Sequence, residues 1–299
     1  MKKLIAFFGL MISLFFLNNN LLAQDDDLLK LISVDKPKKE IVKNAFKSCR
    51  VINAHSMEFV RPGTMDFRIL HRFGLLNQGY KNLYGLDQAT MRMGFDFGIT
   101  KNLMFGVGRS TVKKEVDAFI KYAPFLQATG EKSFPVTFAI VSGITIDGMP
   151  WADPIRPNYF SSRLGYYFQT IIGRKISEAF TLQVVPTLVH KNLVVETNDE
   201  NDIYSVGVGG RMRLSKRISV NWDYFYVLNP LTNISFQNPL SLGFDIETGG
   251  HVFQLHFSNA VGMNERAFIT ETVGKWGKGE VRFGFNLSRV FQIKKKNLD

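Results

Sequence analysis

Charged side chains recur on the polar face of several alternating segments, and they are the strongest candidates for chemistry in this sequence. The basic members are Arg68, Arg72, Arg92, Arg163, Lys175, Arg211, Arg213 and Arg282, and the acidic members are Asp66, Asp96, Asp223, Asp245 and Glu247. If these segments form the wall of a barrel with a water-filled lumen, the eight basic and five acidic side chains would give that lumen a positive bias, which favours anions. The alternative, which we weight equally, is a network of ion pairs that holds a narrow lumen closed. The lumen-binding candidates are Arg68, Arg92, Asp96, Arg211, Arg213, Asp245, Glu247 and His256.

A histidine and a serine two residues apart, His256 and Ser258, are the best sign of catalysis. They resemble the catalytic pair of outer-membrane phospholipase, with the histidine as base and the serine as nucleophile. The phospholipase pair faces lipid, whereas here Phe253 and Leu255 form the lipid-facing side of the strand, so His256 and Ser258 lie on the opposite side. Asn259 lies on the other face from the pair and cannot orient the imidazole. We therefore expect no enzyme activity, and a barrel-embedded lipid hydrolase is the weakest hypothesis.

No residue spacing indicates a metal or cofactor site. Asp245, Glu247, His251 and His256 lie close together, but they match no ligand-spacing motif, so hydrogen bonding in a polar lumen is the preferred interpretation. Cys49 is the sole cysteine, which excludes an internal disulfide and any metal site built from several cysteines. We expect no cofactor and interpret Cys49 as a free thiol.

The elements that position these residues have a period of two. Alternation of apolar with polar or glycine residues runs through Thr64–Phe73, Gln88–Thr100, Arg163–Lys175, Ile218–Leu228 and 281–287. Soluble strands average about five or six residues, whereas membrane-crossing strands need about 9–11. In lipid a sheet must close on itself to pair every backbone group. We predict an all-β fold, a transmembrane up-and-down antiparallel β-barrel of about 12–14 strands with a short helical N-terminal segment.

A soluble barrel or jelly roll with a dry interior is the competing interpretation. It would have to bury Arg92 with Asp96, and Arg211 with Arg213, which is costly unless every charge is paired. The membrane barrel avoids that cost because its charged face borders water. His71 falls on the apolar face of its segment, and the pattern offers no reason for it.

The beginning of the chain is typical of a secretory signal peptide. Lys2 and Lys3 precede the apolar run Leu4–Leu17, and Ala23 marks a cleavage site. The 299-residue chain carries a formal net charge of +11, and export argues against nucleic acid as the reason. We expect an outer-membrane location, with outer-membrane lipid, the barrel-assembly machinery and small solutes as partners, and no nucleic acid.

The predicted organisation has four parts: a signal peptide at 1–23, a partly helical segment and candidate plug at 24–49, the barrel at 50–291, and a charged tail at 292–299. Val51–Val60 would be the first strand, and Lys39–Ser48 has a helical period. Because outer-membrane barrels place short turns in the periplasm, that first strand would run inward from outside. Either residues 24–49 thread the lumen, or a weak strand at Ala267–Thr272 changes the count.

Several motifs resemble one known family. They are Asp66-Phe-Arg68, His71-Arg-Phe-Gly74, Gly85-Leu-Asp-Gln88, Pro186-Thr-Leu-Val-His190, Asp245 to Phe257, Phe268 to Thr272, and Phe283 to Phe291. Together they resemble a bacteroidete family of outer-membrane β-barrels of unknown function. The resemblance spans nearly the whole chain after the signal peptide. It implies a barrel and an outer-membrane location, and it brings no catalytic residues.

Overall fold

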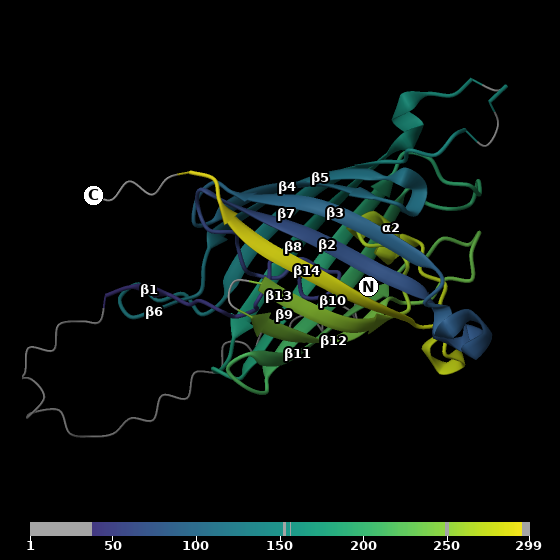
Figure 1. Ribbon diagram of the computed structural model, residues 1–299. Coiled ribbons are helices and arrows are strands. Elements are labelled where there is room, and N and C mark those ends of the chain that lie inside the picture. Colours follow the sequence, from purple (N-terminus) through teal and green to yellow (C-terminus); the bar gives the residue numbers. More distant parts are fainter. Residues whose placement is uncertain (1–37, 152–153, 156, 249–250, 295–299) are drawn as a thin grey trace, which may run out of the picture.

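Twelve antiparallel strands close into one barrel within the described part of the computed structural model, which comprises residues 38–151, 154–155, 157–248 and 251–294 (Figure 1). The barrel strands are β2 (Thr64–Leu75), β3 (Ala89–Gly98), β4 (Leu103–Ser110), β5 (Val116–Phe125), β7 (Thr137–Ile146), β8 (Leu164–Lys175), β9 (Phe180–Lys191), β10 (Asp202–Arg213), β11 (Ile218–Val227), β12 (Leu240–Thr248), β13 (His251–Ser258) and β14 (Arg282–Gln292). Successive barrel strands pair with each other, and β14 pairs with β2 to complete the wall. The predicted up-and-down barrel is confirmed, at the lower strand number.

The remaining elements are short. β1 (Glu40–Ile41) and β6 (Ala128–Thr129) form a two-stranded sheet that projects from one end of the barrel (Figure 1). The helices are η2 (Leu76–Gln78), η3 (Tyr80–Gly85), η4 (Val112–Lys114), η5 (Phe160–Arg163), α2 (Glu265–Thr270) and η6 (Trp276–Lys278). None of the helices in the described ranges is long and apolar enough to cross a membrane.

The pleat of the strands separates an apolar outer face from a polar inner one. Along β2, buried residues alternate with partly exposed ones, and Asp66, Arg68 and Arg72 are among the buried set. Apolar side chains that the wall exposes include Met93, Phe95, Phe105, Val107, Ile120, Ile140, Phe168, Tyr204, Leu242, Phe244, Phe253, Leu255 and Phe257. An apolar belt of this extent fits lipid rather than water.

His71 lies on this apolar face, as its parity predicts, and the seam between β2 and β14 explains it. Its ring stacks on Phe285 of the neighbouring strand, with centroids 4.7 Å apart and an interplanar angle of 10°. Phe73 meets the same ring edge-on at 4.5 Å. His71 therefore packs as one member of an aromatic group.

The two ends of the barrel differ in their connections. One end of the barrel, at which β2 begins, is named here the turn end and lies on the left in Figure 1. The opposite end is named the loop end. The turn end carries the short connections 99–102, 176–179 and 214–217. The loop end carries the long connections 76–88, 147–163, 192–201, 228–239 and 259–281. The first barrel strand starts, and the last one stops, at the turn end.

Two predicted strands are wrong, and their correction resolves the topological conflict. Val51–Val60 lies inside the lumen and forms no barrel strand, so the wall begins at Thr64 and not at residue 50. Both parities of that segment mix apolar with polar residues, so neither face could meet lipid. Most of Ala267–Thr272 belongs to α2, because the Asn264 side chain caps the helix by accepting the Ala267 N–H at 2.9 Å.

The N-terminal segment is not helical where the structure describes it. Within 39–48, residues Glu40–Ile41 form β1 and the rest is irregular, because hydrogen bonds to distant groups replace helical ones. Ala45 N–H, for example, donates to Glu58 Oε1 at 2.6 Å. The predicted signal peptide, the segment at 24–37 and the last five residues of the charged tail lie outside the described residues.

Candidate functional site

A hairpin of residues 45–60, named here the luminal hairpin, enters the barrel from the turn end. Its chain reverses where the Val51 N–H donates to the Ala54 carbonyl at 2.8 Å, and Arg50 and His55 form a β-bridge between its two arms. Residues 49–57 are all buried. A plug therefore occupies the lumen, but it is not the predicted 24–49: only 45–49 of that range belong to it, and most of it is the segment expected to be the first strand.

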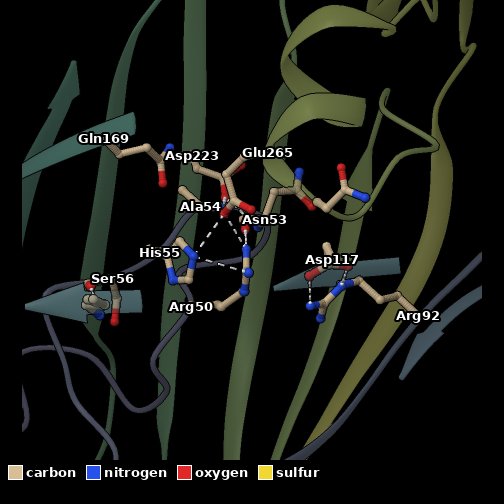
Figure 2. Close-up of polar contacts among 12 residues, drawn as sticks. Arg50, Asn53, Ala54, His55, Ser56, Arg92, Asp117, Gln169, Asp223 and Glu265 are labelled. Carbon is tan, nitrogen blue, oxygen red and sulfur yellow. Dashed lines mark hydrogen bonds and ion pairs between the residues drawn. The ribbon is translucent and has the colours of Figure 1, made fainter. Parts of the chain in front are cut away.

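The tip of the hairpin is held by one carboxylate of the wall. Asp223 on β11 accepts the backbone N–H groups of Ile52, Asn53 and Ala54 through its Oδ2, at 3.2, 2.7 and 3.1 Å (Figure 2). Three converging donors can hold a buried charge without a cationic partner. The Asn53 side chain also donates to Ser241 Oγ at 2.8 Å.

A helix from the loop end meets this hairpin inside the lumen. α2 is buried along its whole length, and Glu265 Oε1 lies 2.6 Å from the Arg50 guanidinium and 3.3 Å from His55 Nε2 (Figure 2). Burial, together with the charge of Arg50, lowers the pKa of His55 well below its usual range, so its imidazole is neutral. Two insertions from opposite ends are thus joined by a buried ion pair across the lumen.

The predicted luminal charges on β2 and β3 face inward and are paired. Arg68 forms an ion pair with Asp66, lies 3.7 Å from Asp96 and donates to Ser48 Oγ of the hairpin at 2.8 Å. Arg92 binds both carboxylate oxygens of Asp117 on β5, with Nε to Oδ1 at 2.8 Å (Figure 2).

Gly108 on the intervening strand β4 makes the Arg92–Asp117 pair possible. A Cβ at this position would lie 2.2 Å from the guanidinium. The luminal glycines thus leave room for buried side chains.

The candidates on β10 contact the hairpin and the turn end. Arg211 donates to the carbonyl oxygens of Asn44 and Ala45, both at 3.1 Å. Arg213 lies at the turn end, partly exposed, 3.4 Å from Glu178. The two arginines therefore have different surroundings: Arg211 is buried against the chain that enters the lumen, whereas Arg213 is exposed at the turn end.

The candidates on β12 and β13 also divide between lumen and turn end. Asp245 is buried and accepts from Gln254 Nε2 at 2.6 Å, whereas Glu247 is half-exposed and forms an ion pair with Lys47 in the first arm of the hairpin. His256 is buried, with its Nε2 at 3.5 Å from Arg72 Nε. Together, the predicted residues anchor or flank the plug instead of forming one open ring.

His256 and Ser258 share the luminal face but do not meet. The Ser258 hydroxyl bonds the Ser241 hydroxyl at 2.9 Å and accepts the Ala260 N–H at 3.2 Å. Neither contact involves an imidazole, so this arrangement offers Ser258 no activating base. Across the described ranges there is also no group of three or more side chains suited to a metal ion.

A charged cluster at the loop end anchors α2 to the rim. Arg266 pairs with Glu115 at 2.5 Å and with Glu271 at 2.7 Å, and Lys113 and Lys191 reach Glu271 at 2.8 and 3.4 Å. Burial alone would raise the pKa of Glu271, but these three cations lower it to about 2. Glu271 is therefore ionised at any physiological pH.

Sequence reasoning missed several residues that close the lumen. Arg50, His55 and Glu265 are not among the predicted candidates. The pattern places His55 in a strand of the wall, and it places Arg50 and Glu265 outside any predicted strand. Lys121 of β5 was missed too, and its Nζ donates to the carbonyl oxygens of Ser56 and Glu58, both at 2.6 Å. The lack of strict alternation in Val51–Val60 was the available signal for the hairpin.

A transmembrane-type barrel with its lumen filled from both ends defines a plugged membrane β-barrel. Residues 46–291 match the family described as membrane bound beta barrel domain (DUF5777), and the chain belongs to that family. No curated protein matches the chain in sequence.

Solved structures with a similar fold include outer-membrane channels. The NanC porin is 8% identical, with a TM-score of 0.46, and the match covers 76% of this chain and 98% of the porin. An outer membrane channel from Pseudomonas putida F1 is 11% identical, with a TM-score of 0.44, and covers 79% and 98%. LpxR from Salmonella typhimurium is 10% identical, with a TM-score of 0.34, and covers 76% and 100%.

Proposed function

We propose that the protein is an outer-membrane channel for small solutes that its luminal hairpin keeps closed at rest. The observation that carries the proposal is the buried Arg50–Glu265 pair, through which the hairpin and α2 meet within the barrel. A solute can cross only if this contact opens. The hairpin, which belongs to the chain before the first wall strand, is the element able to withdraw.

The polar nature of the plug's attachments supports a hairpin that can leave. Asp223, Lys121 and Arg211 each bind backbone groups of the hairpin or of residues just before it. All three wall groups can be hydrated after withdrawal, and water then replaces the backbone partners, which limits the cost of breaking each hydrogen bond. Both arms of the hairpin reach the turn end, so withdrawal requires no threading through the wall.

The charges left behind support a mild preference for anions. Arg68 and Arg92 remain paired with wall carboxylates whether or not the hairpin is present. Lys121 and Arg211 bind carbonyl oxygens, so withdrawal leaves two cations without a formal counter-charge in contact. Asp223 loses its three N–H partners at the same time, which limits the preference.

A closed structural or partner-binding barrel is the second candidate. Phe46, Val51 and Met57 of the hairpin are buried in one cluster with Phe119 and Phe225 of the wall. Exposing such side chains costs about 25 cal/mol per Å² of apolar surface. This apolar part of the contact favours a hairpin that stays in place.

Planar-bilayer conductance of the refolded full chain distinguishes the two candidates. The double variant Arg50→Gln with Glu265→Gln removes the buried pair without leaving either charge alone, and we expect openings about tenfold more frequent than in the wild type, corresponding to about 1.4 kcal/mol. The matched control is Arg213→Gln with Glu178→Gln, an exposed pair at the turn end, which should behave as wild type.

Silence of the wild type, of the double variant and of a chain lacking residues 45–60 would reject the channel and leave the closed barrel. For a conducting variant, the reversal potential in a potassium chloride gradient should indicate anion selectivity. Cation selectivity would contradict the proposed solute class.

Location and partners are part of the same proposal. The predicted signal peptide and the apolar outer face support an outer-membrane address in contact with lipid, reached through the barrel-assembly machinery. The resemblance stated above adds a bacteroidete origin. We propose transport without catalysis, and lipid release from micelles that is lost in Ser258→Ala would contradict this.

A further inference from the structure

An open pocket of about 400 Å³ lies at the loop end of the barrel, outside the plugged lumen. Residues 271–280 of the connection between β13 and β14 form one side, and the rim of β2 and β14 forms the other. We name it the mouth pocket. Its volume falls within the range of about 300–1,000 Å³ that is common for small-molecule sites.

Cations dominate the mouth pocket and its immediate surroundings. Lys275, Lys278 and Arg282 line it, together with Glu271 and Glu280. Adding the partners of these carboxylates in the rim cluster gives six cations, Lys113, Lys191, Arg266, Lys275, Lys278 and Arg282, against three carboxylates, Glu115, Glu271 and Glu280, which is a local net charge of +3.

The acidic groups of the pocket are already engaged, whereas its cations have no carboxylate partner within the described residues. Glu271 contacts three cations, and Glu280 Oε2 accepts the Lys275 N–H at 2.9 Å. Within the described residues, the side chains of Lys275, Lys278 and Arg282 form no ion pair. Arg282 donates from one terminal nitrogen to the Phe73 carbonyl at 3.3 Å, and its buried Nε has no partner there.

The backbone around these cations is held in place. The Asn259 side chain donates to the Gly274 carbonyl at 2.9 Å. A Cβ at Gly274 would lie 2.4 Å from the Glu280 carbonyl, so only glycine permits this close approach of the two loop arms. A fixed loop reduces the conformational entropy that a ligand must overcome on binding.

We propose that the mouth pocket binds a small anion through a phosphate or carboxylate group held by Lys275, Lys278 and Arg282. The lysines contribute point charges, and the guanidinium contributes directed donors suited to oxyanions. This inference names the class of solute that the proposed channel would carry, so the role of the site in transport rests on the proposed function. The site itself is defined without any opening of the lumen.

Calorimetric titration of the detergent-solubilised full chain tests the site, with inorganic phosphate and glycerol 3-phosphate as probes and glycerol as the uncharged comparison. We expect both anions to bind and glycerol not to bind. The double variant Lys275→Gln with Lys278→Gln should weaken binding at least tenfold. The control Lys101→Gln with Lys216→Gln removes the same net charge from exposed residues at the turn end and should retain wild-type affinity.

The proposal would be overturned if neither anion binds, or if both double variants lose the same affinity for the anions. An equal loss would show that the net charge of the protein, and not the mouth pocket, determines binding. Binding without conductance would instead refute the channel and leave the site standing. The bound phosphate could belong to a lipid headgroup or to a free solute, and titration of the protein in lipid nanodiscs distinguishes these two sources. Competition by phosphatidylglycerol but not by phosphatidylcholine assigns the site to lipid headgroups, and absence of competition assigns it to free solutes. Either result supports the site.

Discussion

At the scale of single residues, parity established which side chains face the lumen but not their partners. Arg92 and Asp96 share the luminal face of β3, as their parity predicts, yet Arg92 reaches over Gly108 to Asp117 on β5. Alternation fixes the side of a strand on which a residue lies. The partner depends on the register between strands and on the space left by a glycine, and neither is encoded in one segment.

The Arg92–Asp117 pair leads to a prediction about stability. Arg92→Met leaves Asp117 as a buried charge without its cation, and we expect a loss of about 3–5 kcal/mol. The temperature at which the folded barrel converts to its unfolded form on semi-native gels measures the change. Arg92→Met combined with Asp117→Leu should recover most of the stability, because no charge is left alone. A double variant as unstable as the single one would contradict this explanation.

At the scale of elements, the luminal hairpin should report its own position through Cys49. Cys49 is buried, and burial raises the pKa of its thiol to about 12, so a maleimide should label it slowly at pH 7.5. Asp223→Ala removes the acceptor of three hairpin N–H groups. A hydrogen bond to a charged group contributes about 1.5–3 kcal/mol, so the loss of these bonds should make exposure of Cys49 more frequent and its labelling at least tenfold faster.

The exposed carboxylate Glu178 supplies the control for this measurement. Glu178→Gln lies at the turn end away from the hairpin tip and should leave the labelling rate of Cys49 unchanged. If Asp223→Ala labels as slowly as wild type, the Asp223 contact does not retain the hairpin. If the wild type already labels as fast as the unfolded chain, the hairpin does not rest in the lumen.

The anchoring of the loop that carries α2 should depend on pH through Glu271. The pKa of this group falls from 4.5 to about 2 in the folded protein, so its ionised form stabilises the fold by about 3 kcal/mol above pH 4.5. That contribution is lost as the pH falls from 4.5 through 2. The difference in unfolding temperature between wild type and Glu271→Gln should be constant from pH 7 to 5 and shrink below. A difference that stays constant down to pH 2 would contradict the assignment.

The elements also mark the limit of prediction from the sequence. Strands such as β2 and β3 were predictable because apolar residues alternate with charged, polar or glycine residues along most of their length. The hairpin and α2 were not, because residues enclosed in a lumen touch a mixed wall and need no periodic face. The Asn264 cap was the one local signal for α2, and nothing local indicates that Glu265 would meet Arg50.

At the scale of the whole molecule, an even number of strands returns the chain to the end from which it started. With twelve strands, the start of β2 and the end of β14 both lie at the turn end. A 12-residue strand such as β10 spans about 40 Å at 3.3 Å per residue, which is enough to cross a hydrocarbon core of about 30 Å when tilted. Most connections at the turn end are short and most at the loop end are long, with 126–136 and 111–115 as the exceptions. From this asymmetry we expect the turn end to face the periplasm.

This orientation can be tested on both sides of a single strand. An epitope inserted between Thr197 and Asn198 precedes β10 at the loop end, and one inserted between Ser215 and Lys216 follows it at the turn end. Because both positions are exposed connections, neither insertion should disturb the wall. Antibody should label intact cells only for the loop-end insertion, and both insertions after the outer membrane is permeabilised. Labelling of intact cells at Ser215–Lys216 alone would place the hairpin's entrance, and with it the gate, on the outer surface.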